Sequence, residues 1–162
     1  MLQTGAPAPD FSLALLGGGV FRLRDALAGG PALVGFVKSD CGACQTAFPY
    51  LQRLRSTYRD APWSFLLIAQ DRPEWIGRVV ERYGLTMPIA TEYGEYPVSQ
   101  AYDPEATPTY FWVEPDGRIG KVSSGFAKKE INGFAALAAA RSGREAEDVA
   151  PLDDGVAAFK PG

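Results

Sequence analysis

The sequence contains no histidine, and its 162 residues include only two cysteines. A zinc site built on these cysteines would need two further ligands, and the chain has no other cysteine and no histidine to supply them. The cysteine count also excludes a small scaffold held together by several disulfides. We therefore expect no metal and no other cofactor.

Excess positive charge and long apolar runs are absent as well. The 16 lysines and arginines stand against 19 aspartates and glutamates, so the net charge is −3 and nucleic acid is not expected as a partner. No stretch approaches the ~20 apolar residues of a membrane span. Residues 1–5 lack the basic segment and apolar core of a signal peptide. We expect a soluble monomer, cytoplasmic for the sequence as it stands and extracytoplasmic if a leader has been removed.

The length and a hydrophobic content of 46% fit one domain with a full core. Beyond residue 140 the sequence is polar and contains glycine and proline. We predict a redox domain over residues 1–140, followed by a C-terminal tail over residues 141–162 that is either loosely held or packed along the surface.

The two cysteines lie in the stretch Cys41-Gly42-Ala43-Cys44. The apolar run over residues 32–37 before them indicates a strand buried on both faces. After them, apolar residues recur at helical spacing: Ala47, Phe48, Leu51 and Leu54. Cys41 is therefore expected at a helix N-terminus, where free N–H groups and the helix dipole stabilise a thiolate. The thiolate is the nucleophile in disulfide exchange, and Cys44 is placed to resolve the mixed disulfide.

Two other interpretations of the cysteine pair are open. A structural disulfide would close a very short loop and would constrain little of the unfolded chain. A zinc half-site would lack its remaining ligands. The position between a buried strand and a helix favours a redox-active pair over both.

The first part of the chain predicts a β-hairpin. Apolar residues alternate over residues 11–15 and 20–23, and Gly17-Gly18-Gly19 lies between them. Three glycines can also form a phosphate-binding loop, but no helix start follows them here. A short turn or helix is expected over residues 25–30.

The middle of the chain predicts a βαβ unit. A helix of about twenty residues, kinked at Pro49, should connect the strand over 32–37 to a second buried strand over 65–69. A second helix should begin at Pro73 and end at Gly84, with Trp75 packed against the protein rather than serving as a substrate platform. The remaining predicted elements are a short strand at 88–90, a short helix at 97–102, strands at 107–113 and 118–122 joined by a turn, and a last helix with Ile131, Phe134, Leu137 and Ala138 on its inner face.

Several of these features occur together in one family. They are the hairpin, the Cys41–Cys44 pair, Pro49 five residues later, and Thr107-Pro108-Thr109 entering a hairpin closed by Pro115-Asp116-Gly117. Over roughly residues 7–140 the chain resembles the thioredoxin-fold redoxins, in particular the TlpA/ResA-like thiol–disulfide oxidoreductases. The resemblance implies an α/β fold, a thioredoxin-like three-layer sandwich. Its central mixed sheet is flanked by helices and carries an N-terminal β-hairpin extension.

The resemblance also implies the roles of individual residues. Cys41 would attack and Cys44 would resolve, while Gly42, Ala43, Thr107 and Pro108 would contact the substrate. The Thr107–Pro108 bond would be cis and would face the cysteines, exposing the preceding backbone to a passing peptide. The implied partners are a protein or small molecule that carries a disulfide or dithiol, and an upstream reductant or oxidant.

The chain departs from the family pattern at three positions. Asp40 stands where many relatives have tryptophan before the first cysteine. Gly35 stands where thioredoxins have a buried aspartate, and Ala47 stands where ResA-like proteins have a glutamate. The usual proton acceptor for Cys44 is therefore missing at both expected places.

Two charged residues beside Cys41 are candidates for tuning its pKa. The positive charge of Lys38 would lower that pKa. Asp40 would raise it by repulsion, or would instead point to solvent or cap the helix. Lys38 also replaces the threonine or serine that peroxiredoxins need three residues before their reactive cysteine. A peroxiredoxin-like thiol peroxidase is therefore the second interpretation, and a redox-responsive binding module is the third.

Overall fold

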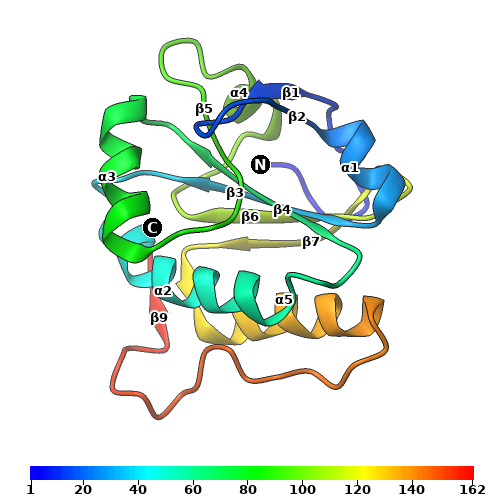
Figure 1. The fold of residues 1–162 in the computed structure, drawn as a ribbon, viewed down its shortest axis with the longest axis vertical. Helices are drawn as coiled ribbons and strands as arrows, with labels where there is room; N and C mark the ends of the chain where they lie inside the picture. Colours follow the sequence, from blue (N-terminus) through cyan, green and yellow to red (C-terminus); the bar gives the residue numbers. More distant parts are fainter.

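The computed structural model describes residues 1–162, and a mixed sheet with helices on both faces lies at its centre (Figure 1). The sheet has the strand order β5-β4-β3-β6-β7. Its strands are β3 (Ala32–Val37), β4 (Ser64–Ala69), β5 (Ile89–Thr91), β6 (Thr109–Val113) and β7 (Ile119–Ser124). The apolar run of β3 lies between β4, to which it is parallel, and β6, to which it is antiparallel. The predicted α/β fold with a central mixed sheet is confirmed.

Five helices cover this sheet: α1 (Leu23–Gly29), α2 (Gly42–Thr57), α3 (Pro73–Tyr83), α4 (Pro97–Tyr102) and α5 (Lys128–Arg141). Successive residues of a strand point to opposite faces, so each buried strand contributes to two cores. The larger core contains Leu33, Tyr110 and Trp112 together with buried residues of α2, α3 and α5, and we call its side the cysteine face. The smaller core contains Phe36, Phe111 and buried residues of α1 and α4, and we call its side the hairpin face.

The predicted N-terminal hairpin is present and lies on the hairpin face (Figure 1). Its strands β1 (Ser12–Ala14) and β2 (Val20–Arg22) are shorter than predicted, and β2 ends at Arg22 because α1 begins at the next residue. An isolated bridge between Leu15 and Ala90 attaches the hairpin to the edge strand β5. The hairpin therefore extends the fold without joining the central sheet.

Helix α2 contains Pro49 and ends at Thr57, after 16 residues. Helix α3 has Pro73 at its first turn and Gly84 in the left-handed conformation at its C-cap, as predicted. The predicted packed position of Trp75 is wrong: its side chain is 46% exposed, and Ile76 and Val79 form the buried face instead. Trp75 points away because it precedes Ile76 by one residue, a rotation of about 100° around the helix.

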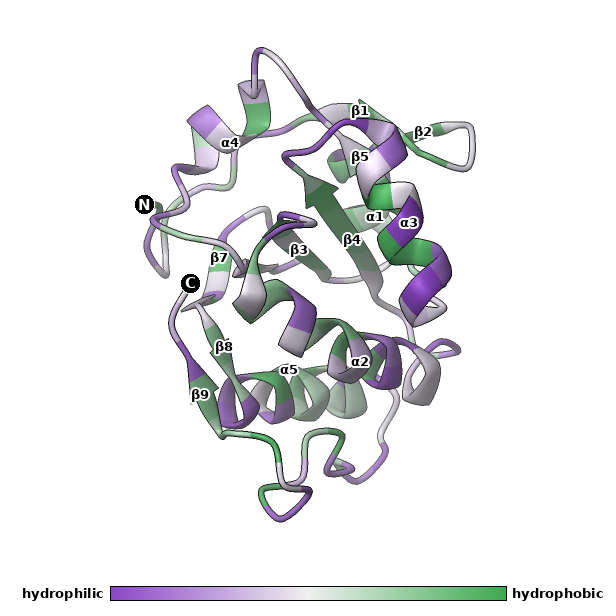
Figure 2. Cartoon of the chain, turned by 90° about the vertical axis from the view of Figure 1, so that its left-hand side faces the viewer, coloured by the Kyte–Doolittle hydropathy of each residue, from purple (hydrophilic) through white to green (hydrophobic).

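The C-terminal tail is packed against the domain, which was one of its two predicted alternatives. Val149 and Ala150 are buried in the cysteine-face core. Further along the tail, β9 (Phe159–Lys160) pairs antiparallel with β8 (Phe126–Ala127), as Figure 2 shows. The tail therefore runs past α2 and α5 and then returns toward the sheet. The division between domain and tail at residue 140 stays a prediction.

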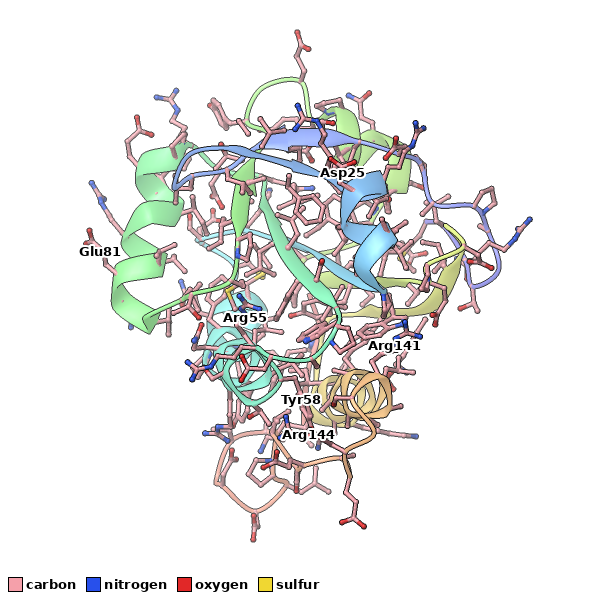
Figure 3. The ribbon with its side chains drawn as sticks, turned by 45° about the vertical axis from the view of Figure 1, so that its right-hand side comes forward. Asp25, Arg55, Tyr58, Glu81, Arg141 and Arg144 are labelled. Carbon is pink, nitrogen blue, oxygen red and sulfur yellow. The ribbon has the colours of Figure 1, made fainter.

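Polar contacts of Lys128 and Arg144 help to hold the tail to the cysteine face. The ammonium group of Lys128 is completely buried, where it donates to the carbonyls of Pro151 and Val156 and pairs with the carboxylate of Asp154. At the end of α2, the guanidinium of Arg144 lies 4.9 Å from the ring centre of Tyr58, and both are labelled in Figure 3.

No helix of the protein combines the length and the hydropathy that a membrane span requires.

Candidate active site

The two cysteines lie where β3 passes into α2, as predicted. Cys41 is the N-cap residue of α2: its backbone is extended, and its Sγ accepts a hydrogen bond from the backbone N–H of Cys44 at 3.2 Å. A sulfur at this position satisfies one of the free donors at the helix N-terminus. Cys41 is partly exposed, whereas Cys44, one turn further, is completely buried. The structure contains both as free thiols.

A cis peptide bond between Thr107 and Pro108 faces this pair, which confirms the predicted isomer. The antiparallel register of β3 and β6 pairs Phe36 with Thr109, so the end of β3 lies beside the start of β6. The Sγ of Cys41 is 3.1 Å from the carbonyl oxygen of Thr107 and donates to it as a thiol. Sheet register therefore unites two segments that are 66 residues apart in the sequence.

The surroundings of the two thiols move their pKa values in opposite directions. The hydrogen bond from the Cys44 thiol is the largest cause that lowers the pKa of Cys41, to about 5. Burial opposes this shift, and hydrogen bonds from the side chain of Thr107 and from the N–H groups of Cys44 and Ala43 reinforce it. Burial raises the pKa of Cys44 far above its usual range, and the hydrogen bond to Cys41 adds to that effect. Near neutral pH, the accessible thiol is ionised and the buried one is protonated.

Lys38 and Asp40 lie in the loop between β3 and Cys41, and both are exposed. Cys41 itself holds the N-cap position, so Asp40 does not cap α2. The groups that shift the pKa of Cys41 are those of Cys44, Thr107 and Ala43. The tuning role of Lys38 and Asp40 stays a prediction.

A buried carboxylate, which the sequence analysis did not single out, holds the same loop. Asp71 is 3% exposed and accepts hydrogen bonds from both the backbone N–H and the hydroxyl of Ser39, each at 2.8 Å. The side chain of Gln45 donates to the carbonyl of Ser39 at 3.0 Å. Asp71 follows β4, whose carboxyl end meets that of its parallel neighbour β3 at one edge of the sheet. The sequence signal that could have placed Asp71 here is its position just after the second buried strand, because the carboxyl ends of parallel strands meet at one edge of the sheet.

The end of the C-terminal tail also reaches the site. A Cβ atom added to Gly42 would lie 3.2 Å from the Nζ of Lys160. A Cβ atom added to Gly162 would lie 2.5 Å from the carbonyl oxygen of Thr107. These two glycines therefore allow the tail to approach both the start of α2 and the cis-proline loop. No local pattern in the sequence predicts this approach.

Comparison with known proteins places the chain in a family. The sequence matches the Redoxin family over residues 3–138. Thiol-disulfide oxidoreductase ResA of Geobacillus thermodenitrificans is 31% identical over 130 residues, which cover 80% of this chain and 74% of that protein. ResA of Bacillus subtilis is 25% identical over 125 residues, which cover 76% of this chain and 69% of that protein.

Solved structures share the fold. The thioredoxin domain of a thiol-disulfide oxidoreductase from Bacteroides vulgatus matches with a TM-score of 0.74 at 22% identity, covering 85% of this chain and 99% of that one. A hypothetical protein from Sinorhizobium meliloti matches with a TM-score of 0.76 at 19% identity, covering 98% of this chain and 91% of that one. Since the family match spans residues 3–138 and the ResA relatives align over most of their length, the chain belongs to the redoxin family, beside the ResA-type thiol–disulfide oxidoreductases.

Proposed function

We propose that the chain exchanges the Cys41–Cys44 dithiol and disulfide with disulfides and dithiols of other proteins. The observation that carries this proposal is the arrangement of the two thiols: Cys41 is partly exposed at the N-cap of α2 and its pKa is lowered, whereas Cys44 is buried one turn further and its pKa is raised. Only a thiolate attacks a disulfide, so this arrangement supports Cys41 as the first nucleophile. The thiol–disulfide oxidoreductase function of the ResA relatives supports the same reaction.

In the reducing direction, the thiolate of Cys41 attacks one sulfur of the substrate disulfide, and the other sulfur leaves as a thiolate. Cys44 then loses its proton and attacks the sulfur of Cys41, which forms the Cys41–Cys44 disulfide and releases the second substrate thiol. Two electrons pass from the cysteine pair to the substrate. The oxidising direction is the reverse sequence, and it needs an upstream oxidant in place of a reductant.

The four residues proposed to contact the substrate differ in exposure. Gly42 is exposed and Thr107 is half-buried, so both can meet a bound peptide. Ala43 and Pro108 are buried, and we propose that they support this surface from below. The proposed partners are a protein disulfide or dithiol and an upstream redox protein. The monomeric state and the compartment stay predictions.

Insulin reduction, measured beside peroxide consumption, tests the proposal. The reduced wild type should accelerate insulin reduction and should consume peroxide only weakly, because Lys38 has no hydroxyl to orient a peroxide. Cys41→Ser should be inactive in both assays. Peroxide consumption that rivals disulfide reduction would replace the proposal with a thiol peroxidase, and activity in neither assay would favour a redox-responsive binding module.

A further inference from the structure

The residue opposite Gly35 explains why that position is a glycine. The register of β3 and β6 places Gly35 directly opposite Tyr110, so their side-chain positions share one face of the sheet. A Cβ atom added to Gly35 would lie 2.9 Å from Cδ1 of Tyr110 and 2.9 Å from Cδ2 of Leu67. The ring of Tyr110 therefore occupies the space where a side chain at position 35 would lie.

This space belongs to the cysteine face. Tyr110 and Cys44 are both buried in the larger core, as is Ala47. The two positions that lack the expected acidic side chains, Gly35 and Ala47, are therefore beside the same core as the phenol of Tyr110. The ring therefore places a phenol hydroxyl in the same buried core as the resolving thiol.

The hydroxyl of Tyr110 is unusual among the buried polar groups. It is the one buried side-chain nitrogen or oxygen atom without a hydrogen-bond partner. By contrast, the hydroxyl of Tyr102 donates to the carbonyl of Pro9 at 2.8 Å, and that of Tyr58 accepts from the backbone N–H of Glu147 at 2.8 Å. An unpaired buried hydroxyl costs free energy, and such a group in a native protein calls for an explanation.

We propose that Tyr110 is the hydrogen-bond donor that stabilises the developing thiolate of Cys44 in the resolving step. When Cys44 attacks the mixed disulfide, its S–H bond breaks, the bond to the sulfur of Cys41 forms, and the bond to the substrate sulfur breaks. The departing substrate thiolate takes the proton. Tyr110 keeps its own proton throughout and donates a hydrogen bond to the sulfur of Cys44 as negative charge develops there. This inference rests on the proposed thiol–disulfide exchange.

The electrostatics of the core agree with a donor role. Burial raises the pKa of Tyr110 well above its ordinary value, and the charges of Cys44 and Cys41 raise it further. The phenol therefore stays protonated and can donate but cannot act as a base. The two sulfurs are thus close enough for their charges to act on the pKa of the hydroxyl.

Tyr110→Phe, which removes only the unpaired oxygen, tests the inference in the full chain. The probe is oxidised glutathione, which forms a mixed disulfide on Cys41 that Cys44 then resolves. Release of glutathione from the mixed disulfide should slow by about tenfold, equivalent to ~1.4 kcal/mol at 25 °C. Alkylation of Cys41 by iodoacetamide reports the first nucleophile and should be unchanged, which also shows that the variant is folded.

Tyr102→Phe is the matched control, because Tyr102 is a buried tyrosine on the hairpin face. It should leave both rates unchanged, while its stability falls because the carbonyl of Pro9 loses its donor. Tyr110→Phe should keep or raise the stability of the reduced protein. An unchanged resolving rate in Tyr110→Phe, or equal slowing in both variants, would overturn the inference. A wild type that exchanges no disulfide at all would instead overturn the proposed function.

Discussion

The two faces of the central sheet are built from the same strands but differ in the kind of polar groups that they bury. On the hairpin face, 12 buried hydrophobic residues pack with α1, α4 and the hairpin, and the hydroxyl of Tyr102 has a partner. On the cysteine face, the core of 30 residues includes the thiol of Cys44 and the ring of Tyr50, over which the buried ammonium of Lys128 lies. The unpaired hydroxyl of Tyr110 lies there too.

Because of this difference, we expect the hairpin face to contribute to folding stability and the cysteine face to contribute to both folding stability and disulfide exchange. Alternation along β3 and β6 sends Phe36 and Phe111 to one side and Tyr110 to the other. A substitution on the hairpin face should therefore affect folding alone. A substitution on the cysteine face should affect folding and disulfide exchange together, because the reacting sulfurs are part of the same packed core.

Replacing either cysteine should have the largest effect, which is loss of nearly all turnover. Cys44→Ser should accumulate mixed disulfides with partner proteins, because attack by Cys41 still occurs and resolution does not. Cys41→Ser should trap none. Non-reducing gel electrophoresis of both variants after incubation with a disulfide-containing protein checks this order. Trapping by Cys41→Ser instead would reverse the assignment of the two thiols.

A matched pair of core truncations tests the separation of the two faces. Phe36→Ala on the hairpin face and Phe134→Ala on the cysteine face each remove a fully buried ring, and each should cost about 3–5 kcal/mol of unfolding free energy. Phe134 packs beside Tyr110, with ring centres 6.0 Å apart, and also beside Trp112. Only Phe134→Ala should therefore slow exchange.

Denaturant titrations of the reduced proteins, followed by insulin reduction under conditions where both variants are folded, measure the two effects. If Phe36→Ala slows exchange as much as Phe134→Ala does, the faces are not functionally separate. If neither variant slows exchange, packing around Tyr110 does not position the resolving thiol.

We expect the pH dependence of the unfolding free energy to arise from the cysteine face, through the ionisation of Cys41. The hydrogen bond from Cys44 lowers the pKa of Cys41 to about 5 in the folded protein, against ~8.5 in an unfolded chain, so the unfolded state binds more protons between these values. Its contribution to the unfolding free energy should therefore rise with pH through this window, be complete above it, and be lost as the pH falls toward 5. Urea titrations of the reduced wild type and Cys41→Ser at several pH values measure the contribution as a difference.

The hairpin face supplies the control for this pH profile. Tyr102→Phe removes a neutral hydrogen bond, so it should lower the unfolding free energy by about 1 kcal/mol at every pH in the same window. A constant difference between the wild type and Cys41→Ser would show that the thiolate does not stabilise the folded state.

Much of the fold was predictable because its signals are local. The apolar run of β3 predicts a central strand, Pro73 and Gly84 predict the ends of α3, and the Cys41–Cys44 spacing before a helix predicts the redox pair. These signals depend on backbone conformation and burial within a few residues. Each segment therefore shows these preferences in its own sequence, without information from the rest of the chain.

The rest of the site depends on tertiary contacts. Asp71 binds Ser39 only because β3 and β4 are parallel neighbours, and Tyr110 fills the space at Gly35 only because of the register between β3 and β6. The exposure of Trp75 shows the same limit, since helical periodicity alone did not decide which neighbouring residue faces the core. Contacts between distant segments have no local signature.

The smallest predicted effect concerns Lys38 and Asp40, which lie in the loop between β3 and Cys41. Both are exposed, so water and salt screen their charges from the sulfur of Cys41. Asp40→Asn should lower the pKa of Cys41 and Lys38→Gln should raise it, each by less than about half a unit. The two effects have opposite signs, so the double substitution should leave that pKa close to the wild-type value. The pH dependence of Cys41 alkylation in the three variants measures these shifts. A shift of a full unit in either single variant would mean that the loop charges, and not only the hydrogen bonds from Cys44 and Thr107, set the pKa of Cys41.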